Sequence, residues 1–253
     1  MNPLRWVWLV LRRRAGETAA AALAIGLVVA YLAAVGSFVT ATRGDLTVRA
    51  AARVPVDWQV QLTSSGDPAA VMTALKDVPG ITGTRSVDLA PVPGFRRNSA
   101  TGERTTGKGY IVGLPPDYAA FAPEEVRPLL GSSTGVALLQ QTAANLAASV
   151  GDTVQIVHGP KIRVEGVIEL PAADSFFQVV GAPPGAGATA PPDNVLVVPA
   201  ATFHTLAQGR TVIHQVHVRF DHSSLPRDPD GAAKLSTQRA NNLAVSVAGG
   251  ALV

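Results

Sequence analysis

The chain has 253 residues, no cysteine, and a formal net charge of +3 from 21 basic and 18 acidic side chains. The first 17 residues hold the whole excess, because they carry four arginines against Glu17; the rest contains 17 basic and 17 acidic residues. Nucleic-acid binding needs basic side chains gathered on one face, so this balance excludes a nucleic-acid partner. Without disulfides, burial of a core must hold the fold together.

Residues 18–42 contain no charged side chain. As a helix they would extend about 37 Å, more than the ~30 Å hydrocarbon layer of a bilayer. We therefore predict a transmembrane helix at residues 18–42. Four arginines precede it, and basic residues beside a span are retained in the cytoplasm. The sequence thus predicts a protein of the cell membrane with a cytoplasmic N-terminus, an anchor in the lipid bilayer, and an extracytoplasmic domain at residues 43–253.

A cleaved signal peptide is the alternative, and Ala34 and Gly36 are small residues of the kind found at such a cut. The apolar stretch of a signal peptide has only about 7 to 15 residues, which favours an uncleaved anchor here.

Residues 1–17 are predicted to form a basic helix on the cytoplasmic membrane surface. Asn2 and Pro3 suit a helix start. Apolar residues then share one face, with tryptophans at headgroup level: Leu4, Val7, Trp8 and Leu11.

Small residues recur at every fourth position of the predicted span: Ala22, Gly26, Ala30 and Ala34. Such a stripe lets another helix approach closely in lipid. An alanine-rich composition explains the same pattern, so both readings stay open.

Strand and helix signals alternate after the span. Residues 56–62 have the period of a half-buried strand, with Val56, Trp58, Val60 and Leu62 opposite Asp57, Gln59 and Gln61. Asp67-Pro68 opens a helix that Pro79-Gly80 closes. Strands are predicted at 81–89 and 109–114, and the polar residues 96–108 between them predict an exposed, mobile loop.

The second half continues the alternation and predicts an α+β fold. A hairpin is predicted around Gly159-Pro160, with Val154 and Ile156 facing Ile162 and Val164. The Pro- and Gly-rich residues 181–193 predict a surface loop. The remaining predictions are a helix at 117–130, a strand at 136–140, a helix at 142–149, the hairpin strands at 153–158 and 161–170, a strand at 194–198, a helix at 200–207, a strand at 211–220, a helix at 229–243 and a strand at 244–248.

Gly102, Gly107 and Lys108 have the spacing of a phosphate-binding loop. Gly109 stands where that motif needs a Ser or Thr for magnesium, and an apolar strand follows where it needs a helix. We reject nucleotide binding at this segment.

Residues 131–135, Gly-Ser-Ser-Thr-Gly, match the turn that presents Ser133 as a hydrolase nucleophile. That turn connects a strand to a following helix, whereas here a helix is predicted before it and a strand after it. No histidine lies in a context typical of a base held by an acid. A plain turn is the better interpretation.

Three histidines, His214, His217 and His222, suggest a metal site, but residues 214 and 217 of one strand point to opposite faces. We expect His214 at the core edge with one hydrogen-bond partner, and His217 facing solvent with Gln215 and Arg219. The sequence therefore predicts no catalytic, cofactor-binding or metal site, and a protein that is not an enzyme.

Two segments carry a resemblance to a known family: Val150-Gly-Asp-Thr-Val154 and Lys161-Ile-Arg-Val-Glu-Gly-Val-Ile168. With the preceding helix and span, they resemble the N-terminal part of FtsX/MacB-like ABC transporter permeases. The resemblance implies an extracytoplasmic MacB-type core domain of two subdomains, in which Gly151 and Gly166 are fold residues. It also implies three further membrane helices, so we expect this chain to be a fragment.

The resemblance implies a function as well. The permease would couple ATP hydrolysis by a separate cytoplasmic ABC ATPase subunit to movement of its extracytoplasmic domain, in a dimer with a second permease copy or a homologue. Substrate export or release would follow; the sequence names neither substrate nor direction. The alternative is a self-sufficient, single-span binding or adaptor protein, and the DNA beyond the last codon distinguishes the two.

Overall fold

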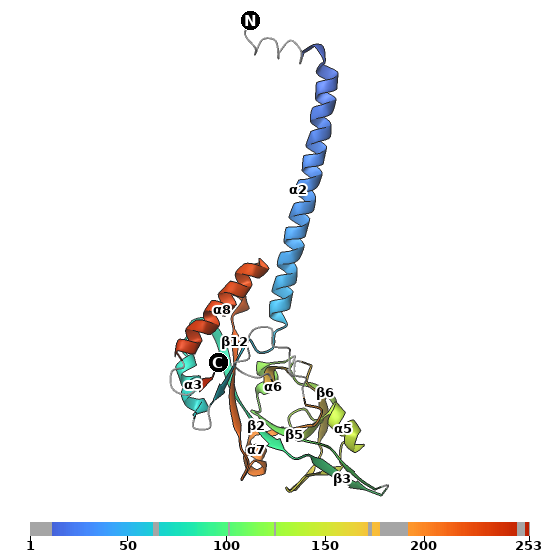
Figure 1. Cartoon of the computed structure of the whole chain (residues 1–253), viewed down its shortest axis with the longest axis vertical. Helices are drawn as coiled ribbons and strands as arrows, with labels where there is room; N and C mark the ends of the chain where they lie inside the picture. Colours follow the sequence, from blue (N-terminus) through green and yellow to red (C-terminus); the bar gives the residue numbers. More distant parts are fainter. Residues whose placement is uncertain are drawn as a thin grey trace.

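One long helix stands on a mixed α/β body, as Figure 1 shows for this computed structural model. The structure describes residues 12–62, 66–100, 102–123, 125–171, 174–177, 192–246 and 251–252. Residues 1–11 of the surface helix predicted at 1–17 and nearly all of the predicted loop at 181–193 lie outside these ranges. Residues 15–17 are the start of the long helix. The body, as named here, comprises the described residues from Trp58 onward.

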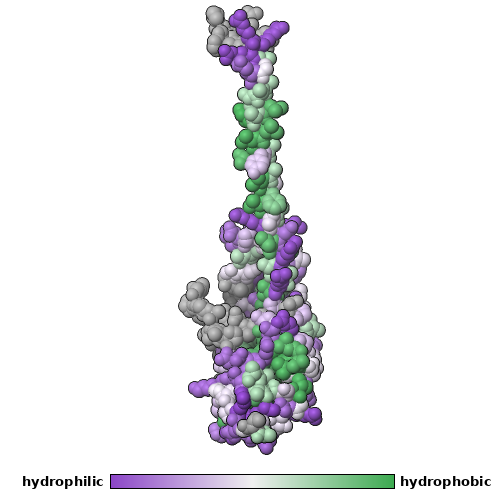
Figure 2. All heavy atoms as spheres, turned by 90° about the vertical axis from the view of Figure 1, so that its right-hand side faces the viewer, coloured by the Kyte–Doolittle hydropathy of each residue, from purple (hydrophilic) through white to green (hydrophobic). Residues whose placement is uncertain are grey.

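The helix α2 runs without a break over Ala15–Ala52. Its 38 residues correspond to about 57 Å, far more than a bilayer core requires. It is the one described helix that is long and apolar enough to cross a membrane. Figure 2 shows its apolar band between two hydrophilic ends. The helix continues about ten residues beyond the predicted span, whose end was placed at Thr42.

Most strands of the body form one nine-stranded sheet in the order β13-β1-β12-β2-β5-β11-β7-β10-β6. Among the described strands, only β5/β11 and β7/β10 are parallel pairs. The strands are β1 (Trp58–Leu62), β2 (Ile81–Val92), β5 (Gly109–Leu114), β6 (Arg127–Gly131), β7 (Ala137–Leu139), β10 (Gly166–Glu169), β11 (Val195–Pro199), β12 (Ile213–Phe220) and β13 (Ala251–Leu252).

A second sheet of four strands has the order β4-β3-β8-β9. The strands are β3 (Phe95–Ser99), β4 (Gly102–Thr105), β8 (Thr153–Ile156) and β9 (Lys161–Arg163). The predicted apolar face is confirmed, because Val154 pairs with Ile162 and both Val154 and Ile156 are buried in the core.

Short helices pack on both faces of the large sheet, and the longer α8 packs beside α2 and α3. The helices of the body are α3 (Pro68–Leu75), α4 (Tyr118–Phe121), α5 (Gln140–Leu146), α6 (Asp174–Phe177), α7 (Ala200–Leu206), the 3-10 turn η1 (His222–Ser224) and α8 (Pro229–Ser246). Asp67 caps α3 by accepting the Ala69 N–H at 2.9 Å, with Pro68 in the first turn, as predicted. Leu75 of α3 packs on Val216 and Val218 of β12.

Two predicted segments were wrong. The expected loop at 96–108 is the β3–β4 hairpin, joined by an ion pair between Arg96 and Glu103 and tied to the neighbouring strand by one between Arg97 and Asp152. The expected helix at 117–130 ends at Phe121, because Pro123 cannot continue it; Pro128 lies in the edge strand β6, where proline is tolerated.

Two smaller predictions need correction as well. The strand expected at 161–170 is two strands, β9 and β10, which belong to different sheets. The strand expected at 244–248 is wrong over 244–246, which continue α8, and the last strand lies at Ala251–Leu252. Overall the α+β fold is confirmed.

Candidate functional site

The candidate site is the junction where α2 meets the body. Gly44 is the one residue of α2 that is buried. A Cβ built on Gly44 would lie 3.5 Å from the Arg227 Cβ, which is van der Waals contact, so the two segments lie directly against each other. Arg227 stands just before α8, which leans along the lower part of α2 in Figure 1. The membrane helix therefore touches the body beyond its own chain connection.

Asp57, the residue just before the body, makes a second link. One oxygen of its carboxylate accepts the Phe220 N–H at 2.7 Å, and the other lies 2.5 Å from His222 Nε2. Asp57 was predicted to be the polar side of a strand, but it precedes β1 and is largely buried. It ties the segment leaving α2 to the end of β12 and to η1.

Arg239 of α8 completes the junction. Its guanidinium donates to the Asp221 backbone oxygen at 3.1 Å and to the Ser224 hydroxyl at 2.6 Å. A hydrogen bond from Ser223 lowers the pKa of the Asp221 carboxyl. The turn η1 is therefore held from both sides, by Asp57 and by α8. Sequence reasoning missed these residues; the signal for the long helix was the absence of any proline between Arg12 and Pro55.

The histidines form no shared site. His214 is at the core edge and bonds Asp88 at 2.7 Å, as predicted. His217 was expected to face solvent, and this was wrong: it is fully buried, because α4 and α6 cover that face of the sheet. Its Nδ1 lies 2.7 Å from the Tyr118 hydroxyl, and its Nε2 lies 3.3 Å from Gln215.

The buried hydrogen bonds of Tyr118, His217 and Gln215 form a network with a structural role. Gln215 continues it by donating to the Phe176 backbone oxygen at 3.1 Å. Burial lowers the pKa of His217 to about 3, so the imidazole is neutral. Burial, with a smaller contribution from the Glu125 charge, raises the pKa of Tyr118 well above its usual value. The network fixes α4 and α6 on the sheet and is closed to solvent at His217.

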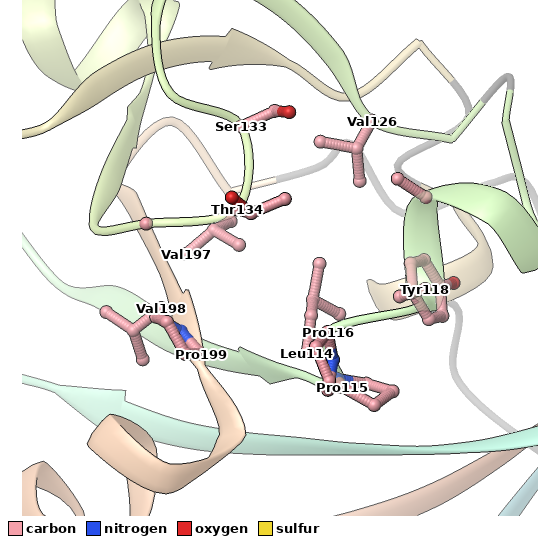
Figure 3. A pocket seen from close by; sticks show the side chains of 12 residues that line it. Leu114, Pro115, Pro116, Tyr118, Val126, Ser133, Thr134, Val197, Val198 and Pro199 are labelled. Carbon is pink, nitrogen blue, oxygen red and sulfur yellow. The ribbon is translucent and has the colours of Figure 1, made fainter.

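The serine turn borders a hollow of about 50 Å³, shown in Figure 3. A strand, β6, precedes the turn, where a helix was predicted. The Ser132 hydroxyl accepts the N–H groups of Thr134 and Gly135 and so closes the turn. Ser133 lines this hollow, as do Tyr118, Val126 and Val197, and none of the twelve lining residues is His, Asp or Glu.

The segment with the spacing of a phosphate-binding loop runs through two strands. Gly102 lies in β4, and the chain passes from Lys108 directly into β5, without the helix that a phosphate loop needs. Across the described ranges, no group of three His, Cys, Asp or Glu residues is arranged to hold a metal ion.

The chain is similar to one domain family and to two solved structures. The family model of the MacB-like periplasmic core domain matches residues 18–240. The periplasmic region of MacB from Actinobacillus actinomycetemcomitans is 13% identical with a TM-score of 0.43, over 75% of this chain and 86% of that one. The extracellular domain of the noncanonic ABC-type transporter YknZ from Gram-positive bacteria is 15% identical with a TM-score of 0.41, over 73% and 95%.

A search of the curated proteins finds no match. The family match spans the apolar helix and most of the body together. The chain therefore belongs to the MacB-like periplasmic core domain family, a domain of ABC-type transporter permeases.

Proposed function

We propose that the chain is the N-terminal part of an FtsX/MacB-type ABC transporter permease, with residues 1–17 in the cytoplasm, residues 18–42 in the bilayer and residues 43–253 outside. In this role it couples ATP hydrolysis by a separate cytoplasmic subunit to movement of the body. One observation carries the proposal: α2 runs unbroken from its apolar band to the contact between Gly44 and Arg227. A rigid helix that is held against the body near Gly44 transmits a displacement of its N-terminal end to the body.

The orientation is tested by cysteine labelling, because the chain has no cysteine of its own. Lys161→Cys places a thiol on the exposed start of β9, and Arg14→Cys places one before the apolar run. In intact cells, a membrane-impermeant maleimide is expected to label residue 161 and to reach residue 14 only after permeabilisation. The reverse pattern contradicts the proposed topology.

Coupling is tested on the complex purified from membranes through a tag on the chain. An ATPase of the ATP-binding-cassette class is expected to copurify. A flexible Gly-Ser-Gly-Ser insertion after Thr42, between the apolar run and Gly44, is expected to leave assembly intact and to abolish the transport-linked part of ATP hydrolysis. A single-span adaptor would copurify with no such ATPase and would tolerate the insertion.

A further inference from the structure

The strand β2 is paired on both sides along only part of its length. β12 pairs with its residues 81–89, and β5 pairs only with Asp88–Val92. β5 ends at Leu114 because Pro115 and Pro116 follow, and proline cannot donate to the ladder. Among the described residues, no strand pairs with residues 81–87 on the β5 side.

The register tells which backbone groups face this open edge. The Tyr110 N–H donates to the Asn194 oxygen, so the even residues of β5 face β11 and the odd ones face β2. Gly113 therefore forms a hydrogen-bonded pair with Asp88. The even residues of β2 accordingly direct their backbone groups toward the β5 side.

By the same alternation, Thr84 and Ser86 present N–H and C=O groups at the open edge. An independent contact agrees, since the Arg85 Nη1 donates to the Thr84 oxygen at 2.7 Å. Arg85 thus caps one edge carbonyl, a common protection of exposed strand edges. Arg85 does not cap the Thr84 N–H or the N–H and C=O groups of Ser86.

A groove of about 500 Å³ runs along this edge, between α3 and β2. Its walls combine three apolar side chains, three threonine hydroxyls and two cations. The lining residues are Ala69, Met72, Thr73, Lys76, Ile81, Thr82, Gly83, Thr84 and Arg85. This mixture suits an extended peptide, which needs backbone partners and alternating side-chain contacts.

The charge of the groove is positive. Lys76 is exposed at the end of α3. Arg85 is already engaged, with Asp117 at 2.6 Å and with the Thr84 oxygen. The acidic residues at the ends of α3, Asp67 and Asp77, do not line the groove. Lys76 is therefore the cation placed to meet a ligand.

We propose that the open edge of β2 binds an extended acidic peptide segment of a partner protein. The segment adds as a strand, pairs with the backbone of Thr84 and Ser86, and sets a carboxylate against Lys76. The groove is a different surface from the junction of α2 and the body, although its residue Ile81 pairs with Phe220 beside that junction. Peptide binding there does not depend on the transport role.

The test uses the full chain in phosphatidylcholine nanodiscs and a fluorescein-labelled peptide, Glu-Val-Thr-Val-Thr-Val-Glu. Fluorescence polarisation is expected to show saturable binding. The same peptide N-methylated at its three central residues is expected not to bind, because it cannot pair as a strand. A peptide with lysine in place of both glutamates is expected to bind about fivefold more weakly.

Two variants of the protein locate the site. Thr84→Pro removes one outward N–H, leaves the ladder to β12 intact, and is expected to weaken binding about tenfold. Lys76→Glu is expected to weaken binding of the acidic peptide about fivefold, and the matched variant Lys161→Glu on β9 is expected to leave it unchanged. If Thr84→Pro does not fold, Lys76→Glu and the N-methylated peptide still decide the question.

Equal binding of the N-methylated peptide overturns strand addition, and equal binding of the lysine peptide overturns the acidic assignment. Absence of binding at millimolar concentration overturns the proposal as a whole. Self-association of the chain that Thr84→Pro abolishes, without peptide binding, would show that a second copy occupies the edge and would overturn it too.

Discussion

Gly44 of the membrane helix lies against Arg227 of the body, where a Cβ on residue 44 would stand 3.5 Å from the Arg227 Cβ. Disulfides join residues whose Cβ atoms are about 3.5–4.5 Å apart. The contact is therefore close enough to be locked chemically.

The double variant Gly44→Cys with Arg227→Cys is expected to form an intramolecular disulfide on mild oxidation. Its product is read from the shift in mobility on a non-reducing gel, and the chain has no other cysteine to compete. The control pairs Gly36→Cys with Arg227→Cys, because residue 36 lies about two turns closer to the N-terminus of α2 and has no neighbour within 4 Å. Equal cross-linking of both pairs would contradict a fixed junction.

His217 predicts a specific pH dependence of stability. In the folded protein its pKa is about 3, below the ordinary value of 6.5, so the folded imidazole stays neutral where the unfolded one binds a proton. The contribution is fully present above pH 6.5 and is lost as the pH falls toward 3. Within that window the free energy of unfolding is expected to fall by about 1.4 kcal/mol per pH unit from this group.

The measurement is denaturant unfolding of the full chain in detergent between pH 7 and 4. In His217→Gln, the free energy of unfolding is expected to change by about 1.4 kcal/mol less per pH unit than in the wild type, because glutamine does not titrate. The control, His204→Gln, changes an exposed histidine of α7 and is expected to keep the wild-type slope. Identical slopes in all three proteins would mean that His217 titrates normally when folded.

The parts of the fold that the sequence predicted are those with a one-sided apolar pattern or a local cap. Strand β1 was found from Val60 and Leu62, and α3 from Asp67-Pro68. The β3–β4 hairpin was missed because its strands are polar and are held by cross-strand ion pairs, which leave no period-two signal. Long-range pairing of charges is not visible in a single sequence.

The site was less predictable for a related reason. His217 alternates with apolar residues of β12, which normally places a residue toward solvent, but this strand is covered on both faces. Likewise, the contact of Gly44 joins segments 183 residues apart, and no local pattern marks it. Both features follow from tertiary packing alone.

Substitutions at three glycines distinguish two causes of lost stability, a clash of the added Cβ and an unfavourable backbone conformation. A Cβ on Gly166 would lie 1.9 Å from the Ser132 backbone oxygen, so Gly166→Ala is expected to cost about 3 kcal/mol. Gly151 has open space around it but a φ of +95°, so Gly151→Ala is expected to cost about 1–2 kcal/mol and Gly151→Val more. The cost at Gly151 is therefore conformational, whereas the cost at Gly166 is steric.

Gly107→Ala is the matched control, because it has neither a neighbour within 4 Å nor a positive φ, and it is expected to change stability by less than about 0.5 kcal/mol. Thermal unfolding of the three variants gives the order directly. A Gly151 variant as stable as the Gly107 variant would refute the conformational argument.

The small-residue stripe of α2 predicts a helix-docking face. Gly26 lies on this stripe and has no neighbour within 4 Å in the single chain, so the face is open to another helix. Gly26→Ile is expected to weaken assembly with a partner membrane helix, because its side chain prevents close backbone approach, while insertion is unaffected. Ala24→Ile adds an isoleucine side chain about 160° around α2 from Gly26 and is expected to leave assembly intact. Recovery in a detergent pull-down of two differently tagged copies measures assembly, and membrane-fraction yield measures insertion. Equal recovery for both variants would favour a general alanine-rich composition as the origin of the stripe.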